Sequence, residues 1–208
     1  MGIFGRKSRD PRLKRLDMEH QLLEDLCKHS DLISYEVIKP RRGVPPDKYL
    51  IHFDVKSIIG IEEEGTPIYG QRHTVKITLP LGYPMTSSPI CYMETDVWHP
   101  NIRSSGEYKG HICINAQVLG YWHTLDMLVQ QIGEMLQYKN YHALQIQPYP
   151  EDAIVAKWVR EYAELEGIVD KEKGIVIDDR SLLNPTQKWL SSRSKKSKIV
   201  IRGIRPKE

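Results

Sequence analysis

The sequence predicts an α+β fold in which one helix precedes a four-stranded antiparallel meander, and further helices follow an irregular segment. The first observation behind this prediction is the helical spacing of apolar residues near the start of the chain. The second is a series of four segments in which apolar and polar residues alternate, and the third is a return of helical spacing in the second half. Strands that follow one another over short links favour an antiparallel meander.

The first helix is predicted over residues 11–28. Charged residues separate its apolar positions, which are Leu13, Leu16, Leu23 and Leu26. Pro11 suits the first helical turn, and Asp10 is a plausible N-cap. Cys27, near the end of the segment, is interpreted as a small buried hydrophobe, which is the usual state of a free cysteine.

Four strands are predicted at residues 33–38, 49–55, 73–79 and 90–93. The link over residues 60–70 is expected to be a hairpin connection whose acidic triplet is solvated. Cys91, in the fourth strand, is expected to face the core.

Helical spacing returns over residues 124–140. The apolar stripe of this segment consists of Leu125, Leu128, Ile132, Met135 and Leu136. Thr124 can cap the helix. Another helix is predicted to begin after Pro150, where a proline and two acidic residues suit a first turn. Beyond Gly167 the pattern weakens to a short strand at 174–177 and a helical turn at 181–190.

The composition excludes several classes of protein. The net charge of +3 is too small to indicate nucleic acid as a partner. No apolar run approaches the roughly 18 residues of a membrane span, and the first residues have no apolar segment typical of a signal peptide. Three cysteines at unrelated spacings argue against disulfides and against a zinc site. We therefore expect a cytoplasmic protein without metal, cofactor or membrane partner.

The segment that indicates a chemical function is Trp98-His-Pro-Asn-Ile102, followed after eight residues by His111-Ile-Cys-Ile-Asn115. A thiol held on a loop beside a turn amide can accept and pass on an acyl group, because a thiolate attacks carbonyl carbon and an amide N–H stabilises the oxyanion. The residues alone leave alternatives open. Cys113 could be a core cysteine, and Asn101 could be a turn asparagine bonded to its own backbone.

These residues resemble the active-site signature of ubiquitin-conjugating (carrier) enzymes. The likeness includes His99–Ile102, Gly110–Ile114, Trp122 and the leucine-patterned helix after it, together with the proline-rich stretch at 83–89. The resemblance covers roughly residues 10–165 and implies the ubiquitin-conjugating-enzyme fold. It also implies that Cys113 accepts a ubiquitin-like modifier as a thioester from an activating enzyme, and that the modifier passes to a lysine of a target protein. No cofactor is implied, because ATP is consumed upstream.

The resemblance also assigns roles to the neighbours of the cysteine. In this family the asparagine that matches Asn101 stabilises the oxyanion or braces the active-site loop. His99 is expected to bond backbone groups and fix the turn, and Pro100 to rigidify it. Trp122 is expected to pack under the loop that carries Cys113.

The chain departs from the family pattern in two places near this site. The link over residues 103–110 is longer than usual, which leaves open how closely Asn101 approaches Cys113. Many members have an acidic or serine residue after the helix that follows the cysteine, whereas residues 138–143 contain no carboxylate. His142 or Tyr141 could replace it as proton acceptor, or could simply lie at the surface.

The first helix and the C-terminal segment suggest partner contacts. Arg12 and Arg15 are candidates for docking the activating enzyme, although basic helix faces are often only solvated. We expect a flexible terminus at 1–9, a catalytic domain at 10–165 and a basic extension at 166–208. The departures resemble carrier enzymes of bacterial ubiquitin-like conjugation systems, which are linked to antiphage defence; the sequence identifies no ligase.

Two rival functions remain open from the sequence. One is a non-catalytic binding module on the same fold. The other is a cysteine peptidase that pairs Cys113 with His99 or His142.

Overall fold

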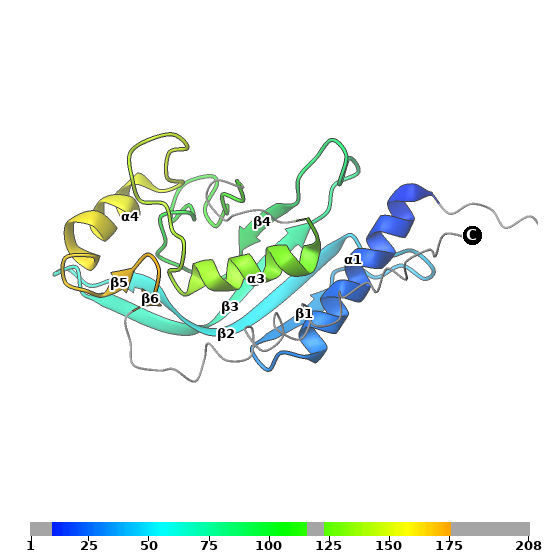
Figure 1. The fold of residues 1–208 in the computed structure, drawn as a ribbon, viewed down its shortest axis with the longest axis horizontal. Helices are drawn as coiled ribbons and strands as arrows, with labels where there is room; N and C mark the ends of the chain where they lie inside the picture. The colour runs from blue at the N-terminus through cyan, green and yellow to red at the C-terminus, as the bar shows by residue number, and fades with distance from the viewer. Residues whose placement is uncertain (1–9, 116–122, 176–208) are drawn as a thin grey trace, which may run out of the picture.

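The computed structural model describes residues 10–115 and 123–175 (Figure 1). Along these residues one helix is followed by a four-stranded antiparallel sheet and then by further helical segments, so the predicted α+β order is confirmed. The described part of the chain contains no helix that is long and apolar enough to cross a membrane.

Helix α1 covers Pro11–Lys28, the range predicted from the sequence. Asp10 caps it, because its carboxylate accepts the N–H of Arg12 at 2.9 Å, and Pro11 in the first turn has no N–H to satisfy. Cys27, in the last turn, is half-buried against the core. The side chains that α1 buries are those of Leu16, Glu19, Leu23 and Leu26. A carboxylate among three leucines requires polar partners, which are described below.

The four strands are paired in sequence order. Their bounds are Ile33–Val37 for β1, Lys48–Ile61 for β2, Pro67–Thr78 for β3 and Ile90–Met93 for β4. Helices α1 and α3 cover one face of this sheet and enclose the main hydrophobic core (Figure 1). Cys91 on β4 faces this core, as predicted, and is 1% exposed.

Strands β2 and β3 are much longer than the sequence predicted, and the expected connection over residues 60–70 is mostly strand. Only a short turn joins them, closed by the hydrogen bond from the N–H of Glu62 to the carbonyl of Thr66 at 2.9 Å. The register shifts twice, between Asp54 and Ser57 and between Ile58 and Gly60. Each shift interrupts the alternation of inward and outward side chains. The strands predicted from that alternation were therefore too short.

Helix α3 covers Leu125–Leu136 and therefore ends before the predicted residue 140. Tyr138 and Asn140 both adopt positive φ angles, of 63° and 54°. A right-handed helix requires negative φ angles, so it cannot continue through these residues. Thr124 occupies the N-cap position, but its hydroxyl donates to Asp126 and makes no capping bond. The predicted capping role of its side chain is therefore wrong.

A second, smaller core lies at the far end of the β2–β3 hairpin, under helix α4 (Ala153–Trp158) and the π-helical turn η1 (Val159–Ala163) (Figure 1). A two-stranded hairpin of β5 (Val169–Asp170) and β6 (Gly174–Ile175) completes it. The N–H of Ile175 donates to the carbonyl of Gln137 at 2.9 Å. The expected helical turn at 181–190 and the rest of the basic extension lie outside the described residues.

The β5–β6 hairpin lies beyond the boundary expected at residue 165, which leads to a prediction about truncation. The reference for this prediction is a chain that ends at residue 175, the last residue that the structure describes. A chain that ends at residue 165 should lose about 2 kcal/mol of unfolding free energy, because Val169 is buried and its hairpin bonds the end of α3. Thermal unfolding of the two truncated chains checks this; equal stability would mean that the hairpin contributes nothing.

Candidate active site

Cys113 and Asn101 are joined through their main chains. The N–H of Cys113 donates to the carbonyl of Asn101 at 3.0 Å, and the buried residues Ile102 and Ile112 form an antiparallel bridge beside this bond. Residues 103–110 close on themselves, because the N–H of Gly110 donates to the carbonyl of Arg103 at 2.8 Å. The extra residues of the long loop therefore do not separate Asn101 from Cys113.

The Asn101 side chain has a fixed orientation. It is 1% exposed, and its Oδ1 accepts the main-chain N–H of His142 at 3.0 Å. Since a main-chain N–H can only donate, the oxygen must face His142, and the Nδ2 amide hydrogens are the donors that remain for another group. The oxygen of the Asn101 amide thus holds the segment that begins at His142, while its N–H groups can still donate to another group.

His99 fixes the turn that carries Asn101. Its Nδ1 accepts the main-chain N–H of Asn101 at 3.1 Å, and its ring lies edge-on to Tyr138. The ring is fully buried, and burial lowers the pKa of His99 to about 3, so the imidazole is neutral at physiological pH. A neutral ring with Nδ1 engaged is a poor partner for a thiolate, which argues against the Cys113–His99 peptidase. Pro100 adds a second anchor, because its carbonyl accepts the N–H of Asp152 at 3.0 Å.

The Cys113 thiol is half-buried. Burial raises its pKa, the negative charge of Glu151 adds to this effect, and a hydrogen bond from the backbone of Asn115 opposes it. Burial also raises the pKa of Cys27 to about 11 and that of Cys91 to about 12. Cys113 is therefore a protonated thiol at neutral pH, and it would have to lose its proton to act as a nucleophile.

Two carboxylates that the sequence analysis placed only at a helix start lie against the active-site segment. Glu151 Oε1 is 3.1 Å from His111 Nδ1 and 3.4 Å from Arg103 Nη2. Asp152 Oδ2 accepts the N–H of Ser104 at 2.9 Å and also its hydroxyl. Residues 138–143 contain no carboxylate, whereas Glu151, farther along the chain, contacts His111, two residues before Cys113.

Asp152 joins the long loop to helix α4. Its Oδ1 accepts the N–H groups of Ile154 and Val155 at 3.0 and 3.1 Å, which caps the helix. Burial alone would raise the pKa of Asp152, but the hydrogen bonds from Ser104 and from the helix N–H groups hold it below its usual value. The carboxylate is thus ionised at neutral pH and holds residues 103–110 against α4.

The sequence of this chain matches a known protein family. Residues 42–169 match the family model described as ubiquitin-conjugating enzyme. The chain belongs to this family. The matched range includes Asn101, Cys113 and Glu151, and the predicted ubiquitin-conjugating-enzyme fold is confirmed.

One curated member of the ubiquitin-conjugating enzyme family is similar to this chain. It is "Ubiquitin-conjugating enzyme E2 27" of Arabidopsis thaliana, which is 31% identical over 134 residues. The alignment covers 54% of this chain and 62% of that relative, so the chain spans less than two thirds of the relative's length.

Among the candidate residues of this ubiquitin-conjugating domain, His142 and Tyr141 differ in position. The main chain of His142 bonds to Asn101, and its ring Nε2 lies 3.3 Å from the carbonyl of Ile146. Tyr141 points away into the second core, where it is 2% exposed and donates to Glu164 at 2.6 Å. Burial raises the pKa of Tyr141, and the bond to Glu164 raises it further. Of the two, only His142 contacts Asn101, through its main chain; Trp122 lies outside the described residues.

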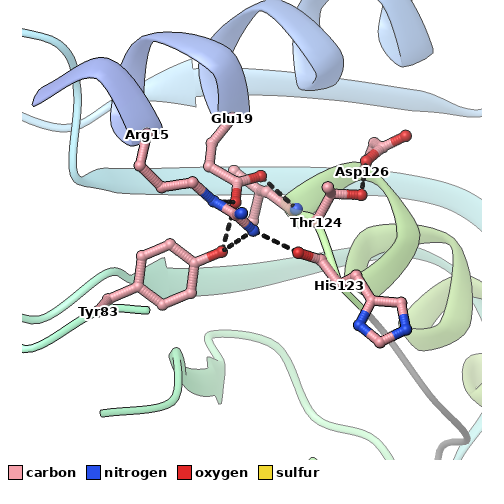
Figure 2. Close-up of polar contacts among 7 residues, drawn as sticks. Arg15, Glu19, Tyr83, His123, Thr124 and Asp126 are labelled. Atoms are coloured by element: carbon pink, nitrogen blue, oxygen red, sulfur yellow. Dashed lines mark hydrogen bonds and ion pairs between the residues drawn. The ribbon is translucent and has the colours of Figure 1, made fainter. Parts of the chain in front are cut away.

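Arg12 and Arg15 use their guanidinium groups within the ubiquitin-conjugating domain. Arg12 Nη2 donates to the carbonyls of Leu79 and Pro80 at 3.2 and 3.3 Å. Arg15 Nε donates to Glu19 Oε1 at 2.6 Å, and its Nη2 donates to the carbonyl of His123 (Figure 2). Both side chains tie α1 to the segments that follow β3 and precede α3. Their contribution to partner docking remains a prediction.

Glu19 replaces Thr124 as the side chain that satisfies the start of α3. Its Oε2 accepts the N–H of Leu125 at 2.6 Å, and its Oε1 accepts from Arg15 and from the Tyr83 hydroxyl (Figure 2). One fully buried carboxylate thus connects α1, the link after β3 and α3.

We therefore predict that Glu19→Ala destabilises the domain by about 3–5 kcal/mol, since it leaves Arg15 without its counter-charge and Leu125 without its acceptor. For a domain of this size the melting temperature should fall by about 10 °C. Glu24→Ala, at an exposed position of the same helix, is the matched control and should change the stability by less than about 0.5 kcal/mol. Equal melting temperatures for the two variants would show that the network contributes no stability.

Proposed function

We propose that this chain is a carrier enzyme that holds a ubiquitin-like modifier as a thioester on Cys113 and transfers it to an amine of a target protein. The observation that supports it most strongly is the hydrogen bond between the main chains of Cys113 and Asn101, within the segment that matches the ubiquitin-conjugating enzyme family. This bond joins the main chain of the residue with the half-buried thiol to that of Asn101, whose side-chain oxygen is used by His142 while the Nδ2 hydrogens are not.

The first step is an exchange of thioesters. The Cys113 sulfur attacks the carbonyl carbon of the modifier's C-terminal thioester on the activating enzyme. A new C–S bond forms, the old C–S bond breaks, and the released thiolate takes up the proton that Cys113 loses. No strong base is required, because thiol exchange proceeds at near-normal thiol pKa values.

The raised pKa of Cys113 predicts the pH dependence of this step. Because the protonated thiol is the native form at neutral pH, the thiolate fraction and the charging rate should rise about tenfold per pH unit from pH 6 to 8. The measurement is the pre-steady-state charging rate at saturating activating enzyme, corrected for the pH dependence of that enzyme with a fixed small thiol as acceptor. A plateau below pH 7 would indicate a lowered pKa and contradict this assignment.

The second step is aminolysis. A neutral acceptor amine attacks the thioester carbonyl, a C–N bond forms, the C–S bond breaks, and the proton from the amine passes to a base while sulfur leaves as thiolate. Nδ2 of Asn101 would donate to the oxyanion. Glu151 would attract the ammonium form of the acceptor, and His142 would act as the proton acceptor.

The partners of the proposed reaction are the activating enzyme, the modifier and a target protein with an acceptor lysine. The long loop and the basic extension distinguish the chain from the usual family pattern. They support placing it in a bacterial ubiquitin-like conjugation system with a role in antiphage defence. We propose that it acts in the cytoplasm, where a free thiol persists.

Incubation with an activating enzyme, a ubiquitin-like modifier and ATP tests the proposal. The carrier should form an adduct that disappears with a reducing thiol and that requires ATP. A non-catalytic module would bind the modifier without such an adduct, and a cysteine peptidase would cleave a modifier fusion instead. Either of these results, with an activating enzyme that charges a known carrier, would contradict the proposed function.

A further inference from the structure

His111 lies in the active-site segment but has no role in the two steps described above. It stands two residues before Cys113, and Ile112 between them is fully buried. His111 and Ile112 each form an antiparallel bridge to a neighbouring segment, so this stretch of chain is extended. Side chains alternate along an extended stretch. The side chains of His111 and Cys113 therefore project on the same, accessible side, from positions that are roughly 6–7 Å apart along the chain.

Glu151 and Tyr92 fix the orientation of the His111 imidazole. Its Nδ1 is 3.1 Å from Glu151 Oε1, and the Tyr92 ring meets it edge-on with the two ring centroids 5.3 Å apart. Because the carboxylate is the acceptor in this contact, Nδ1 carries the proton, and Nε2 of the neutral ring has the free electron pair. None of the residues that the structure describes bonds Nε2, so this nitrogen remains available to a substrate.

The carboxylate and imidazole do not serve the thiol directly. A histidine that deprotonates a cysteine is hydrogen-bonded to its sulfur, and His111 makes no such bond to Cys113. The pKa of Cys113 depends on burial, on the charge of Glu151 and on the backbone of Asn115, without a contribution from His111. An oriented imidazole beside the sulfur, but not bonded to it, suits a proton transfer from the second substrate.

The acceptor lysine has to lose two protons in the aminolysis step. In water its side chain is an ammonium group with a pKa of about 10.4, and an ammonium nitrogen has no electron pair for attack. One proton must therefore leave before the attack, and a second leaves as the C–N bond forms. His142 is the proposed acceptor of the second proton, and the first still needs an acceptor. Glu151, which attracts the ammonium group, would bring it to the imidazole that the same carboxylate orients.

We propose that His111 is a catalytic base that removes the first proton from the acceptor lysine. One N–H bond of the ammonium group breaks, an Nε2–H bond forms, and the positive charge moves to the imidazole, which then passes the proton to water. Glu151 stabilises the imidazolium, whereas Arg103, whose Nη2 is 3.4 Å from the same carboxylate oxygen, favours release of the proton. This inference rests on the proposed carrier function, because it adds a residue to the same reaction.

The test is single-turnover discharge of the pre-charged His111→Asn variant. Asparagine can still donate an N–H to Glu151, but it has no nitrogen in the place of Nε2. The two acceptors are free lysine and hydroxylamine, which is already a neutral nucleophile at pH 7. Discharge to lysine should slow by about 10² in maximal rate, and discharge to hydroxylamine should be unchanged. The lysine concentration that gives half the maximal rate should also be unchanged, because Glu151 still attracts the ammonium group.

The pH dependence of lysine discharge gives a second readout. A higher pH supplies neutral lysine from solution, so the ratio of the unmodified rate to the His111→Asn rate should fall from pH 7 to pH 9. The charged and titratable groups that face His111 are Glu151 before α4, Arg103 in the long loop and Tyr92 on β4. All three are retained in the variant, so the change in the ratio reports on His111. A constant ratio would overturn the proposal.

His29→Asn is the matched control, because it makes the same substitution in a histidine–carboxylate pair far from the site. His29 follows α1, and its Nδ1 is 3.5 Å from Asp25 Oδ1. The control should leave both discharge rates unchanged. His111→Gln, which also lacks the imidazole, should repeat the result of His111→Asn and replaces that variant if it does not fold.

Three results would overturn the proposal while the carrier function stands. Equal slowing with lysine and hydroxylamine would show that His111 only holds the active-site segment in place. Unchanged discharge to lysine would show that it takes no proton. Loss of charging in the His111 variants, with normal charging of the control, would place His111 in the first step instead. If the unmodified chain is never charged, the proposed function itself fails, and the role of His111 fails with it.

Discussion

Replacing Cys113 by alanine should abolish the thiol-sensitive adduct with the modifier completely. Alanine has no sulfur to form the thioester, and burial raises the pKa of Cys27 to about 11 and that of Cys91 to about 12. Cys113→Ser should give either no adduct or an oxyester that survives reducing thiol. The measurement is gel electrophoresis of charging reactions with and without reductant.

Cys27→Ala is the matched control for this experiment, because Cys27 is also half-buried but lies on α1. It should charge as the unmodified chain does. If the Cys113→Ala variant still forms a thiol-sensitive adduct, Cys27 or Cys91 accepts the modifier and the assignment of the site is wrong.

Asn101→Ala should slow discharge to free lysine by about 10² to 10³ and affect charging much less. Exchange of one thioester for another needs little stabilisation, whereas aminolysis builds up charge on the carbonyl oxygen. The measurement is single-turnover discharge of the pre-charged variant from pH 6 to 9, alongside the rate of charging.

A second variant separates the two possible roles of Asn101. Aspartate at this position keeps an oxygen that can accept the N–H of His142, but it has no amide N–H for an oxyanion. If Asn101→Asp discharges as slowly as Asn101→Ala, the Nδ2 donor matters. If instead charging and discharge fall equally in the alanine variant, Asn101 only keeps the loop folded.

Much of the fold could be predicted because the pattern is local. The bounds of α1 and β4 agree with the predictions residue for residue, and in α1 a cap, a proline and a clear apolar period mark the range. The β2–β3 hairpin could not be predicted at its full length, because the bulges after Asp54 and Ile58 break the alternation on which the prediction depended.

The residues of the candidate site could be predicted only where they lie together in one sequence motif. Cys113, Asn101 and His99 stand within fifteen residues of each other, and the fold joins them by short hydrogen bonds. Glu151 and Glu19 escaped prediction, because their partners are 40 and 106 residues away in the sequence. A glutamate in a charged helix or before a helix indicates solvent exposure, and only tertiary packing turns it into a buried or site-facing group.

The most direct measurement of the central claim uses the chain with all three cysteines intact. After a charging pulse, the reaction is stopped at low pH, the chain is unfolded, and the free thiols are alkylated before peptide mass spectrometry. The account predicts that Cys113 escapes alkylation in proportion to the charged fraction, while Cys27 and Cys91 are alkylated fully. Full alkylation of Cys113 in a charged sample, with protection of another cysteine, would contradict it.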